Sequence, residues 1–482
     1  MMSDQQKKIV FSPFTRVEGD MRLSVEIDNG AVTTARASGT LFRAFEQLLR
    51  GREPRDAIVV LCRICGQCGG AHSGAAAGAL ADAYGAERPP NAVLSTAVIR
   101  GTEMVLSHLA HFCFSFSADL CGLPGHAALE ERFAPIKGTS FQRMLRARRV
   151  LLGLMGLFAG KWPNTLAIQP GGVTRPLNQG ELIRASGILA EFVRFLEDQL
   201  LGCPVGRWME VNSLRDLDGW LGAGGHADSD LGVFASTALE SGLDAVGRGP
   251  GRYLSAGGFR LPDGETWLQA GYLDAEVRPF DQSLIAEQVE FSWFESDTEA
   301  EHPAGARATP APDKSNAYSW AKAPRYDGRS VEVGPMARLL IDGDPLAADL
   351  VERRGPSVFA RVLLRLHETV RLVAALQDWV GRIDPEKPFY RKHEAADQAE
   401  GFALVEAPRG TLGHWVRVER GRIRNYQVVT PTSWNLSPRD ADENPGPVEE
   451  ALVGTPVLDP EKAVKVALVV RSYDPCLYCS VH

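Results

Sequence analysis

The feature that most constrains this chain is a pair of Cys-x-x-Cys motifs at opposite ends of the sequence. One is Cys65-Gly66-Gln67-Cys68 and the other is Cys476-Leu477-Tyr478-Cys479. Each motif places two thiolates on one short turn, so a fold that joins the two ends of the chain brings four sulfurs to one site. Zinc, iron–sulfur clusters and nickel all suit such soft ligands. The sequence therefore predicts a metal site that closes a loop of about 400 residues.

Two plainer interpretations of the motifs stay open at this point. A single Cys-x-x-Cys motif also occurs in thioredoxin-like redox sites, although neither motif here lies in a βαβ pattern of that kind. A structural zinc site is the other, although such a site usually keeps its ligand pairs close together in the sequence. A disulfide scaffold is excluded, because eight cysteines are too dilute in a chain of 482 residues.

Composition and charge exclude several classes of partner. Apolar residues make up 44% of the chain and charged residues 23%, which is normal for a well-packed globular protein. The formal net charge of -8 argues against nucleic acid or an anionic membrane surface. The first residues are polar, and no segment reaches the roughly 18–20 apolar residues that span a bilayer. We therefore expect no membrane span and a cytoplasmic location, with a membrane-associated or periplasmic location through a partner subunit as the alternative.

Hydrophobic periodicity predicts an α+β fold that is mainly α-helical. Apolar residues recur at helical spacing in four stretches that are long enough for a central helix bundle: residues 91–120, 141–158, 182–201 and 358–380. Two β-hairpins are expected, one turning at Asn29-Gly30 and one joining residues 415–418 to 423–429. Segments 221–226 and 302–313 are typical of exposed loops. The expected architecture is one large domain over residues 1–482, with small peripheral β-sheets.

The residues around the cysteines resemble a known family. Residues 63–72 (RICGQCGGAH) and 474–482 (DPCLYCSVH) are similar to the two metal-binding signatures of nickel–iron hydrogenase large subunits. Three further blocks resemble that family in the expected order: residues 15–19 (TRVEG), 406–410 (EAPRG) and 430–435 (TPTSWN). The resemblance covers residues 10–482. It implies the large-subunit fold and reversible conversion of dihydrogen to protons and electrons.

The resemblance assigns all four cysteines to one nickel–iron centre. Cys65 and Cys476 would be terminal ligands of nickel, while Cys68 and Cys479 would bridge nickel to iron. The iron in this family carries one carbon monoxide and two cyanide ligands. Soft thiolates suit nickel, and open coordination positions accept hydrogen.

Several residues near this centre are given catalytic roles by the same resemblance. Cys476 would accept the first proton and Glu18 would relay it, although Glu18 taken alone is an ordinary acid after a turn. Arg409, preceded by Pro408, would lie over the open metal site and polarise hydrogen. Asp119 and Asp474 would hold that arginine; the plainer interpretation of Asp119 is an unremarkable helix acid.

Residues around the iron and near the C-terminus complete the implied site. Pro431, Thr432 and the backbone beside them would bind a cyanide, and His72 would lie against a bridging sulfur rather than act as an ordinary core histidine. Glu46, His482 and a backbone carbonyl near Val428 would bind a magnesium or ferrous ion. Without the family, Glu46 is more often a solvated helix acid.

The chain holds no further cysteine set for a cluster wire, so a separate small subunit that carries iron–sulfur clusters is implied. The expected assembly is a heterodimer or a dimer of heterodimers. A hydrogen-sensing subunit with low turnover is the main alternative function. A quinone-binding respiratory relative is disfavoured because all four cysteines are present. Gln67 and Asp20 depart from the usual family residues, and Gln67 stands where a small aliphatic residue lines the gas path.

Overall fold

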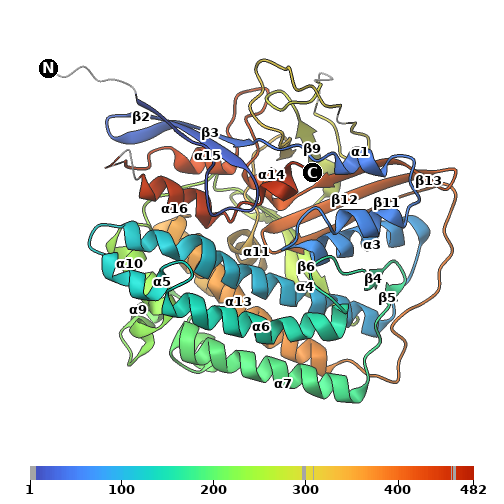
Figure 1. The fold of residues 1–482 in the computed structure, drawn as a ribbon, viewed down its shortest axis with the longest axis horizontal. Helices are drawn as coiled ribbons and strands as arrows, with labels where there is room; N and C mark the ends of the chain where they lie inside the picture. The colour runs from blue at the N-terminus through green and yellow to red at the C-terminus, as the bar shows by residue number, and fades with distance from the viewer. Residues whose placement is uncertain (1–6, 296–299, 308, 458, 460–462) are drawn as a thin grey trace.

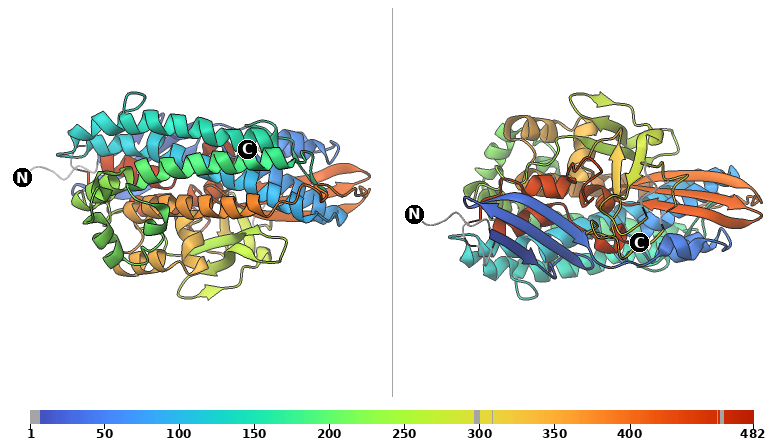
Figure 2. Two further views of the ribbon diagram at one scale, coloured as in Figure 1. Left: turned by 90° about the horizontal axis from the view of Figure 1, so that it is seen from below. Right: turned by 90° about the horizontal axis from the view of Figure 1, so that it is seen from above.

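The computed structural model describes residues 7–295, 300–307, 309–457, 459 and 463–482. Its centre is a bundle in which α4 (Pro90–Ala110), α6 (Thr139–Ala159), α7 (Gln179–Phe195) and α13 (Val358–Gly381) pack side by side (Figures 1 and 2). These helices confirm the four stretches expected from the periodicity. The bundle buries nearly every apolar residue of α4 and α13 in one large core.

Helix ends in the bundle follow from local side-chain chemistry. Asn178 caps α7, because its side chain accepts a hydrogen bond from the amide of Glu181 while the Glu181 carboxylate accepts one from the amide of Asn178. Ser357 caps α13 by accepting a hydrogen bond from the amide of Ala360. Both helices therefore begin where the sequence offers a capping side chain.

The segment after α4 departs from the predicted continuous helix. Residues His111–Phe116 form a π-helix and Ser117–Gly122 a 3-10 helix. The most apolar 18-residue window of the run Pro90–Gly122 has a mean hydropathy of 1.2, so this run is long and apolar enough, by length and composition, to cross a membrane. The expectation that no segment reaches this limit was therefore wrong. In the structure 72% of its most apolar window is buried inside the protein, as in the core helix of a bundle.

The predicted N-terminal hairpin is confirmed. Strands β1 (Lys7–Phe11), β2 (Met21–Asp28) and β3 (Ala31–Gly39) form one antiparallel sheet, seen edge-on at the upper left of Figure 1. Asn29 and Gly30 have φ angles of 51° and 76°, as a two-residue turn between twisted strands requires. Alternate residues of β2 are buried, so one face of this sheet packs on the core.

The second predicted hairpin is also confirmed and gains a strand. Strands β12 (Gly410–Glu419) and β13 (Arg422–Val429) turn at Arg420 and Gly421, which both have positive φ. Strand β11 (Ala399–Ala407), which the sequence analysis did not predict, pairs with β12. This sheet projects from one end of the molecule, and α3 (Gly69–Tyr84) packs against β11 and β12 (Figure 2).

The remaining elements are short. The other antiparallel strands are β4 (Ile168–Gln169), β5 (Gly172–Val173), β6 (Tyr253–Arg260), β7 (Thr266–Leu273), β8 (Val277–Arg278), β9 (Ile285–Gln288) and β10 (Ala323–Tyr326). The other helices are α1 (Phe45–Leu49), α2 (Asp56–Leu61), α5 (Glu130–Phe133), α8 (Val205–Trp208), α9 (Leu214–Leu221), α10 (Asp230–Glu240), α11 (Pro335–Asp342), α12 (Pro345–Arg354), α14 (Pro431–Asn435), α15 (Pro447–Leu452), α16 (Val464–Ser472) and α17 (Leu477–Ser480). The loop expected at 221–226 follows α9, and that at 302–313 has no helix in its described residues; residue 308 lies outside them. The fold class is α+β and mainly helical, as predicted.

The two ends of the chain meet beside α3. Glu18 and Cys476 form a β-bridge in which the amide of Leu477 donates to the carbonyl oxygen of Glu18 at 2.6 Å. Gly19 has a φ of +88°, and a Cβ atom there would lie 3.0 Å from the amide nitrogen of Tyr478. Only glycine gives this turn and this close approach together. The backbone thus carries the C-terminal cysteines to the N-terminal ones.

Candidate metal centre

The four cysteines of the two motifs converge at one buried point. The Sγ atoms of Cys476 and Cys479 are 3.1 Å apart, those of Cys68 and Cys479 are 3.4 Å apart, and those of Cys65 and Cys476 are 3.5 Å apart. None of these side chains is more than 4% exposed. All eight cysteines lie in the described part of the chain and all are free thiols. Four unbonded thiols at such distances form a donor set for a soft metal ion.

The thiols also perturb one another's ionisation. Hydrogen bonds from Cys476, Cys479 and Cys68 lower the pKa of the Cys65 thiol well below its usual value. Contact with Cys476 instead raises the pKa values of Cys68 and Cys479. The cluster therefore accommodates one negative charge easily and four only with a cation among them. This charge pattern fits the expected metal centre.

A buried arginine borders the cluster. Arg409 is 4% exposed, and it donates from Nε to the backbone carbonyl of Asp474 at 2.7 Å and from Nη2 to the Asp474 carboxylate at 3.1 Å. Its Nη1 is buried and has no partner among the described residues. Burial opposes its charge, but Asp474 and then the thiolates of Cys476 and Cys65 raise the pKa of Arg409, so its cation faces the sulfurs. Pro408 lies beside it, and its carbonyl oxygen contacts His108 Nε2 at 3.1 Å.

The structure places Asp119 in a different part of this charge network from the one the sequence predicted. One carboxylate oxygen contacts the guanidinium of Arg16 and the other contacts that of Arg471. Asp474, in contrast, pairs with a second arginine besides Arg409: Arg365 Nη1 lies 3.4 Å from Asp474 Oδ2. Asp119, in the 3-10 helix Ser117–Gly122, therefore binds Arg16 just before the Glu18 turn and Arg471 near the end of α16, not Arg409.

Glu18 lies half-buried at the edge of the cluster. Its backbone pairs with Cys476, and its carboxylate accepts a hydrogen bond from the side-chain amide of Gln67. Burial raises the pKa of Glu18 above its ordinary value, and the Arg409 charge partly offsets this. A carboxyl with a raised pKa beside a thiolate is suited to proton transfer near neutral pH.

Thr432 and Pro431 begin the short helix α14 next to Cys476. The Cys476 amide donates to Thr432 Oγ1 at 3.1 Å, which leaves the threonine hydroxyl hydrogen available to another acceptor. Pro431 is the first residue of α14, and both side chains are buried. These two residues therefore present a donor and an apolar wall to the sulfur cluster.

His72 lies one turn after Cys68 on α3, where its amide donates to the Cys68 carbonyl at 3.1 Å. Its ring Nδ1 is 3.1 Å from Nε2 of His414, whose Nδ1 is 3.0 Å from the hydroxyl of Tyr426. Burial lowers the pKa of His72 to about 3, so its ring is neutral. Sequence reasoning missed His414 and Tyr426, because no motif connects them to residue 72.

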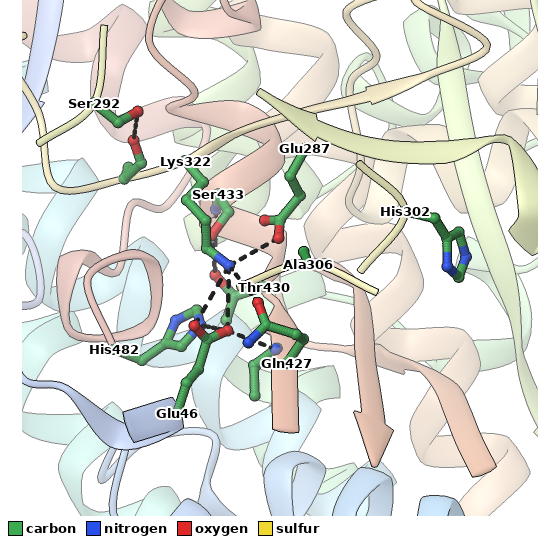
Figure 3. A network of polar contacts seen from close by, with 12 residues as sticks. Glu46, Glu287, Ser292, His302, Ala306, Lys322, Gln427, Thr430, Ser433 and His482 are labelled. Atoms are coloured by element: carbon green, nitrogen blue, oxygen red, sulfur yellow. Dashed lines mark hydrogen bonds and ion pairs between the residues drawn. The ribbon is translucent and has the colours of Figure 1, made fainter. Parts of the chain in front are cut away.

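A second polar cluster surrounds Glu46 near the C-terminus (Figure 3). Lys322 Nζ lies 2.8 Å from Glu287, 3.2 Å from Gln427 Oε1 and 3.2 Å from Glu46. Burial opposes ionisation of Glu46, but Lys322 and His482 hold the pKa of Glu46 at about 2. The amide of Val428, rather than the expected carbonyl, donates to Glu46 at 2.9 Å. Lys322, Glu287 and Gln427 were not predicted; a lysine carries no sequence signal for such a site.

The His482 ring tests whether a cation fits this cluster. Its Nδ1 lies 2.5 Å from the carbonyl oxygen of Cys479, which can only accept, so Nδ1 carries a hydrogen. Its Nε2 then faces Glu46 Oε1 at 3.3 Å, where a neutral imidazole would oppose one acceptor to another. An imidazolium or a metal ion resolves this conflict, and a histidine that donates to a carbonyl from its other nitrogen is the usual metal ligand. The residues present therefore fit a cation.

The buried four-thiol cluster, with a buried arginine near it, defines a protein that binds metal through thiolates. Comparison with known proteins gives the family. The family model for nickel-dependent hydrogenase matches residues 43–121 and 230–482, which is more than half of the chain. The chain belongs to the nickel-dependent hydrogenases and is a hydrogenase large subunit.

Individual relatives and solved structures agree with this family. The chain is 31% identical to the "Periplasmic [NiFeSe] hydrogenase large subunit" of Desulfomicrobium baculatum, with 100% of this chain and 96% of the relative covered. It is 27% identical to the "Uptake hydrogenase large subunit" of Rubrivivax gelatinosus over 100% of this chain and 96% of the relative. A solved [NiFeSe] hydrogenase from Desulfovibrio vulgaris Hildenborough superposes with a TM-score of 0.86 at 32% identity, covering 100% of both chains.

These relatives correct the predicted location. The expectation of a cytoplasmic protein was wrong, because a relative that matches along the whole chain is named as periplasmic. The expectation rested on the polar N-terminal residues, and these carry no information about an export signal on another chain.

Proposed function

We propose that this large subunit cleaves dihydrogen heterolytically, and reversibly, at a nickel–iron centre held by the four cysteines. The observation that carries the proposal is the buried cluster of free thiols with Sγ–Sγ distances of 3.1–3.5 Å. Cys65 and Cys476 would serve as terminal ligands, and Cys68 and Cys479 as bridges. Because both ends of the chain build this site, residues 1–482 would work as one domain.

A nickel–iron pair held by the four cysteines, with carbon monoxide and two cyanides on iron, would supply the site at which hydrogen is bound and split. Arg409 then polarises the substrate, since its unpartnered Nη1 is fixed by the two bonds that the guanidinium makes to Asp474. Thr432 would donate its free hydroxyl hydrogen to a diatomic ligand, and Pro431 and Pro408 would help to exclude water. Asp119 contributes indirectly by binding Arg16 and Arg471.

The proton leaves through the Cys476 thiol to the Glu18 carboxylate. The β-bridge between Glu18 and Cys476 keeps these two residues adjacent, and a carboxyl with a raised pKa is suited to proton transfer near neutral pH. Gln67 orients the carboxylate that receives the proton. The electrons would pass to a small subunit that carries iron–sulfur clusters, in a heterodimer or a dimer of heterodimers.

The Glu46 cluster would bind a magnesium or ferrous ion. Glu46 and His482 supply the ligands, and a backbone carbonyl near Val428 is the expected third. Lys322 would lie beside this ion and balance the second carboxylate, Glu287. A role in fixing the C-terminal turn follows, because His482 also contacts the carbonyl oxygen of Cys479.

Infrared spectroscopy of the purified protein, before and after hydrogen is added, tests this function. Metal-bound carbon monoxide and cyanide absorb where protein is nearly silent. Bands that shift under hydrogen support the proposal, and their absence in protein with full nickel occupancy contradicts it. The alternative, a hydrogen-sensing subunit, predicts the same bands with very slow turnover and binding to a regulatory protein.

A further inference from the structure

Three buried side chains form a continuous hydrogen-bonded chain that ends beside the cysteine cluster. His72 on α3 contacts His414 on β12 at 3.1 Å, and His414 contacts Tyr426 on β13 at 3.0 Å. Their exposed fractions are 1%, 0% and 0%. Neither imidazole lies within ion-pair distance of a carboxylate in the described part of the chain, and burial lowers the pKa of both rings. Each ring is therefore neutral and has one donor nitrogen and one acceptor nitrogen.

The tyrosine sets the direction of this chain. The Tyr426 hydroxyl has no other polar partner among the described residues, and it is fully buried. If it accepted from His414, its own O–H hydrogen would remain unsatisfied in an apolar core, which is costly. The hydroxyl therefore donates to His414 Nδ1, and the hydrogen of His414 must be on Nε2.

The same logic fixes the next ring. Because His414 Nε2–H donates to His72 Nδ1, the hydrogen of His72 must be on Nε2, on the far side of the ring from His414. His72 lies one turn after Cys68 on α3, and its amide donates to the Cys68 carbonyl. The ring N–H at Nε2 makes no hydrogen bond to any described residue, so it is free to bond to a thiolate of the neighbouring sulfur cluster.

We propose that Tyr426 and His414 are positioning residues that hold His72 in the Nε2–H tautomer, so that this N–H is presented to the metal-binding thiolates. A hydrogen bond to a thiolate withdraws electron density from the sulfur and hence from a metal bound to it. The two residues would therefore set the electron richness of the centre from a distance. The tautomer stands on the geometry alone, whereas its effect on the metals rests on the function proposed above.

The tautomers can be measured directly. The full chain is labelled with nitrogen-15 at histidine, and two-bond proton–nitrogen correlations report which ring nitrogen carries hydrogen. We expect Nε2–H at both His72 and His414, and loss of this single tautomer at both rings in Tyr426→Phe. Tyr326→Phe is the matched control, since Tyr326 is a buried tyrosine whose hydroxyl accepts one bond, from the Asp281 amide at 2.8 Å. Nδ1–H at His72, or unchanged tautomers in Tyr426→Phe, would overturn the proposal.

The effect on the metals is read from the infrared bands of the assembled holoenzyme. His414→Gln keeps an acceptor oxygen and a donor nitrogen at similar spacing, so we expect wild-type band positions. In His414→Leu the carbon monoxide band should move to lower wavenumber, because a thiolate without its N–H partner donates more strongly. Tyr426→Phe, which is nearly isosteric, should move it the same way and serves if His414→Leu does not fold.

The two proposals fail in different ways. Wild-type protein with full nickel but no carbon monoxide or cyanide bands would contradict the proposed function, while the tautomer measurement still tests the relay. If the carbon monoxide band of both His414→Leu and Tyr426→Phe stays at the wild-type position, the positioning role alone is contradicted.

Discussion

Gln67 and Glu18 are joined by a hydrogen bond in which the Gln67 side-chain amide donates to the Glu18 carboxylate. The two residues come from segments that are 49 positions apart, and both lie beside the metal centre. Gln67 is the middle of the first cysteine motif, so the residue that spaces the ligands also touches the proposed proton acceptor. Proton transfer and ligand spacing are therefore linked through one side chain.

Replacing Gln67 by leucine should slow hydrogen oxidation several-fold and shift its pH profile upwards. The amide stabilises the ionised carboxylate, so its loss raises the pKa of Glu18 further and leaves the carboxylate less well oriented. Hydrogen-dependent dye reduction across pH measures both effects. Gln269→Leu, at an exposed glutamine whose side-chain amide donates to the Thr266 carbonyl, should behave as wild type. An unshifted profile in Gln67→Leu would contradict the orienting role.

Arg409→Lys should reduce turnover by about 100-fold or more, the usual cost of losing a preorganised electrostatic donor. A lysine cannot contact the carbonyl and the carboxylate of Asp474 at once while it keeps a further N–H free, as Arg409 does at Nη1. Nickel and iron contents measured by mass spectrometry should stay unchanged. Arg371→Lys, which alters an arginine paired with Asp342 and Asp344 in the bundle, is the control. Equal turnover of the two variants would refute the assignment.

His482→Ala should remove one divalent cation per chain while nickel is retained. The variant deletes the imidazole that faces Glu46 at 3.3 Å, and it should also lower the thermal midpoint, because the C-terminal turn loses its contact to Cys479. Elemental analysis and calorimetry measure the two effects. His302→Ala is a fair comparison, since His302 lies apart from the cluster (Figure 3). If both variants retain the same metals as wild type, no cation is bound there.

Glu449→Gln should flatten the dependence of stability on pH. Glu449 on α15 is 1% exposed, and burial raises its pKa to about 7 although the Ala37 amide and the Tyr318 hydroxyl donate to it. Because this folded-state pKa is above the unfolded one, the contribution is fully present below about pH 4.3 and is lost as pH rises through 7.

The change in unfolding free energy from this one group is on the order of 3 kcal/mol. Chemical denaturation at several pH values measures it. Burial also raises the pKa of Glu103 to about 7, so the unfolding free energy of Glu449→Gln should still fall with pH, by a similar amount, because of Glu103. A slope identical to that of wild type would show that Glu449 ionises normally in the folded protein.

The elements that sequence reasoning predicted are those with a local signal. Four amphipathic stretches became the bundle, and Asn29-Gly30 marked a turn that needs positive φ. Strand β11 was not predicted, because exposed and buried positions alternate only weakly along it. Most of its residues are only partly buried, and only the last two are fully buried. The π-helix after α4 was not predicted either, since the periodicity of apolar residues does not distinguish an α-helix from a π-helix.

In the site, the cysteines of the two motifs lie together, as expected. The contacts made by residues outside the motifs were not predicted. Lys322 reaches Glu46 over 276 positions, and His414 reaches His72 over 342, with no pattern at either end to indicate it. Asp119 was assigned to Arg409 by analogy, whereas two nearer guanidiniums bind it. Contacts of this kind depend on packing, which one sequence does not display.

The separation of the cysteine pairs also sets an order of events during synthesis. Cys65 and Cys476 are 411 positions apart. A ribosome that adds about 5–20 residues per second leaves the first pair alone for roughly 20–80 seconds. During that interval it is an open two-thiol site, and copper or zinc binds such a site more tightly than nickel or ferrous iron do. The four-thiol site therefore exists only after α17 emerges and docks, so the last residues to be synthesised decide when the metal centre can be completed.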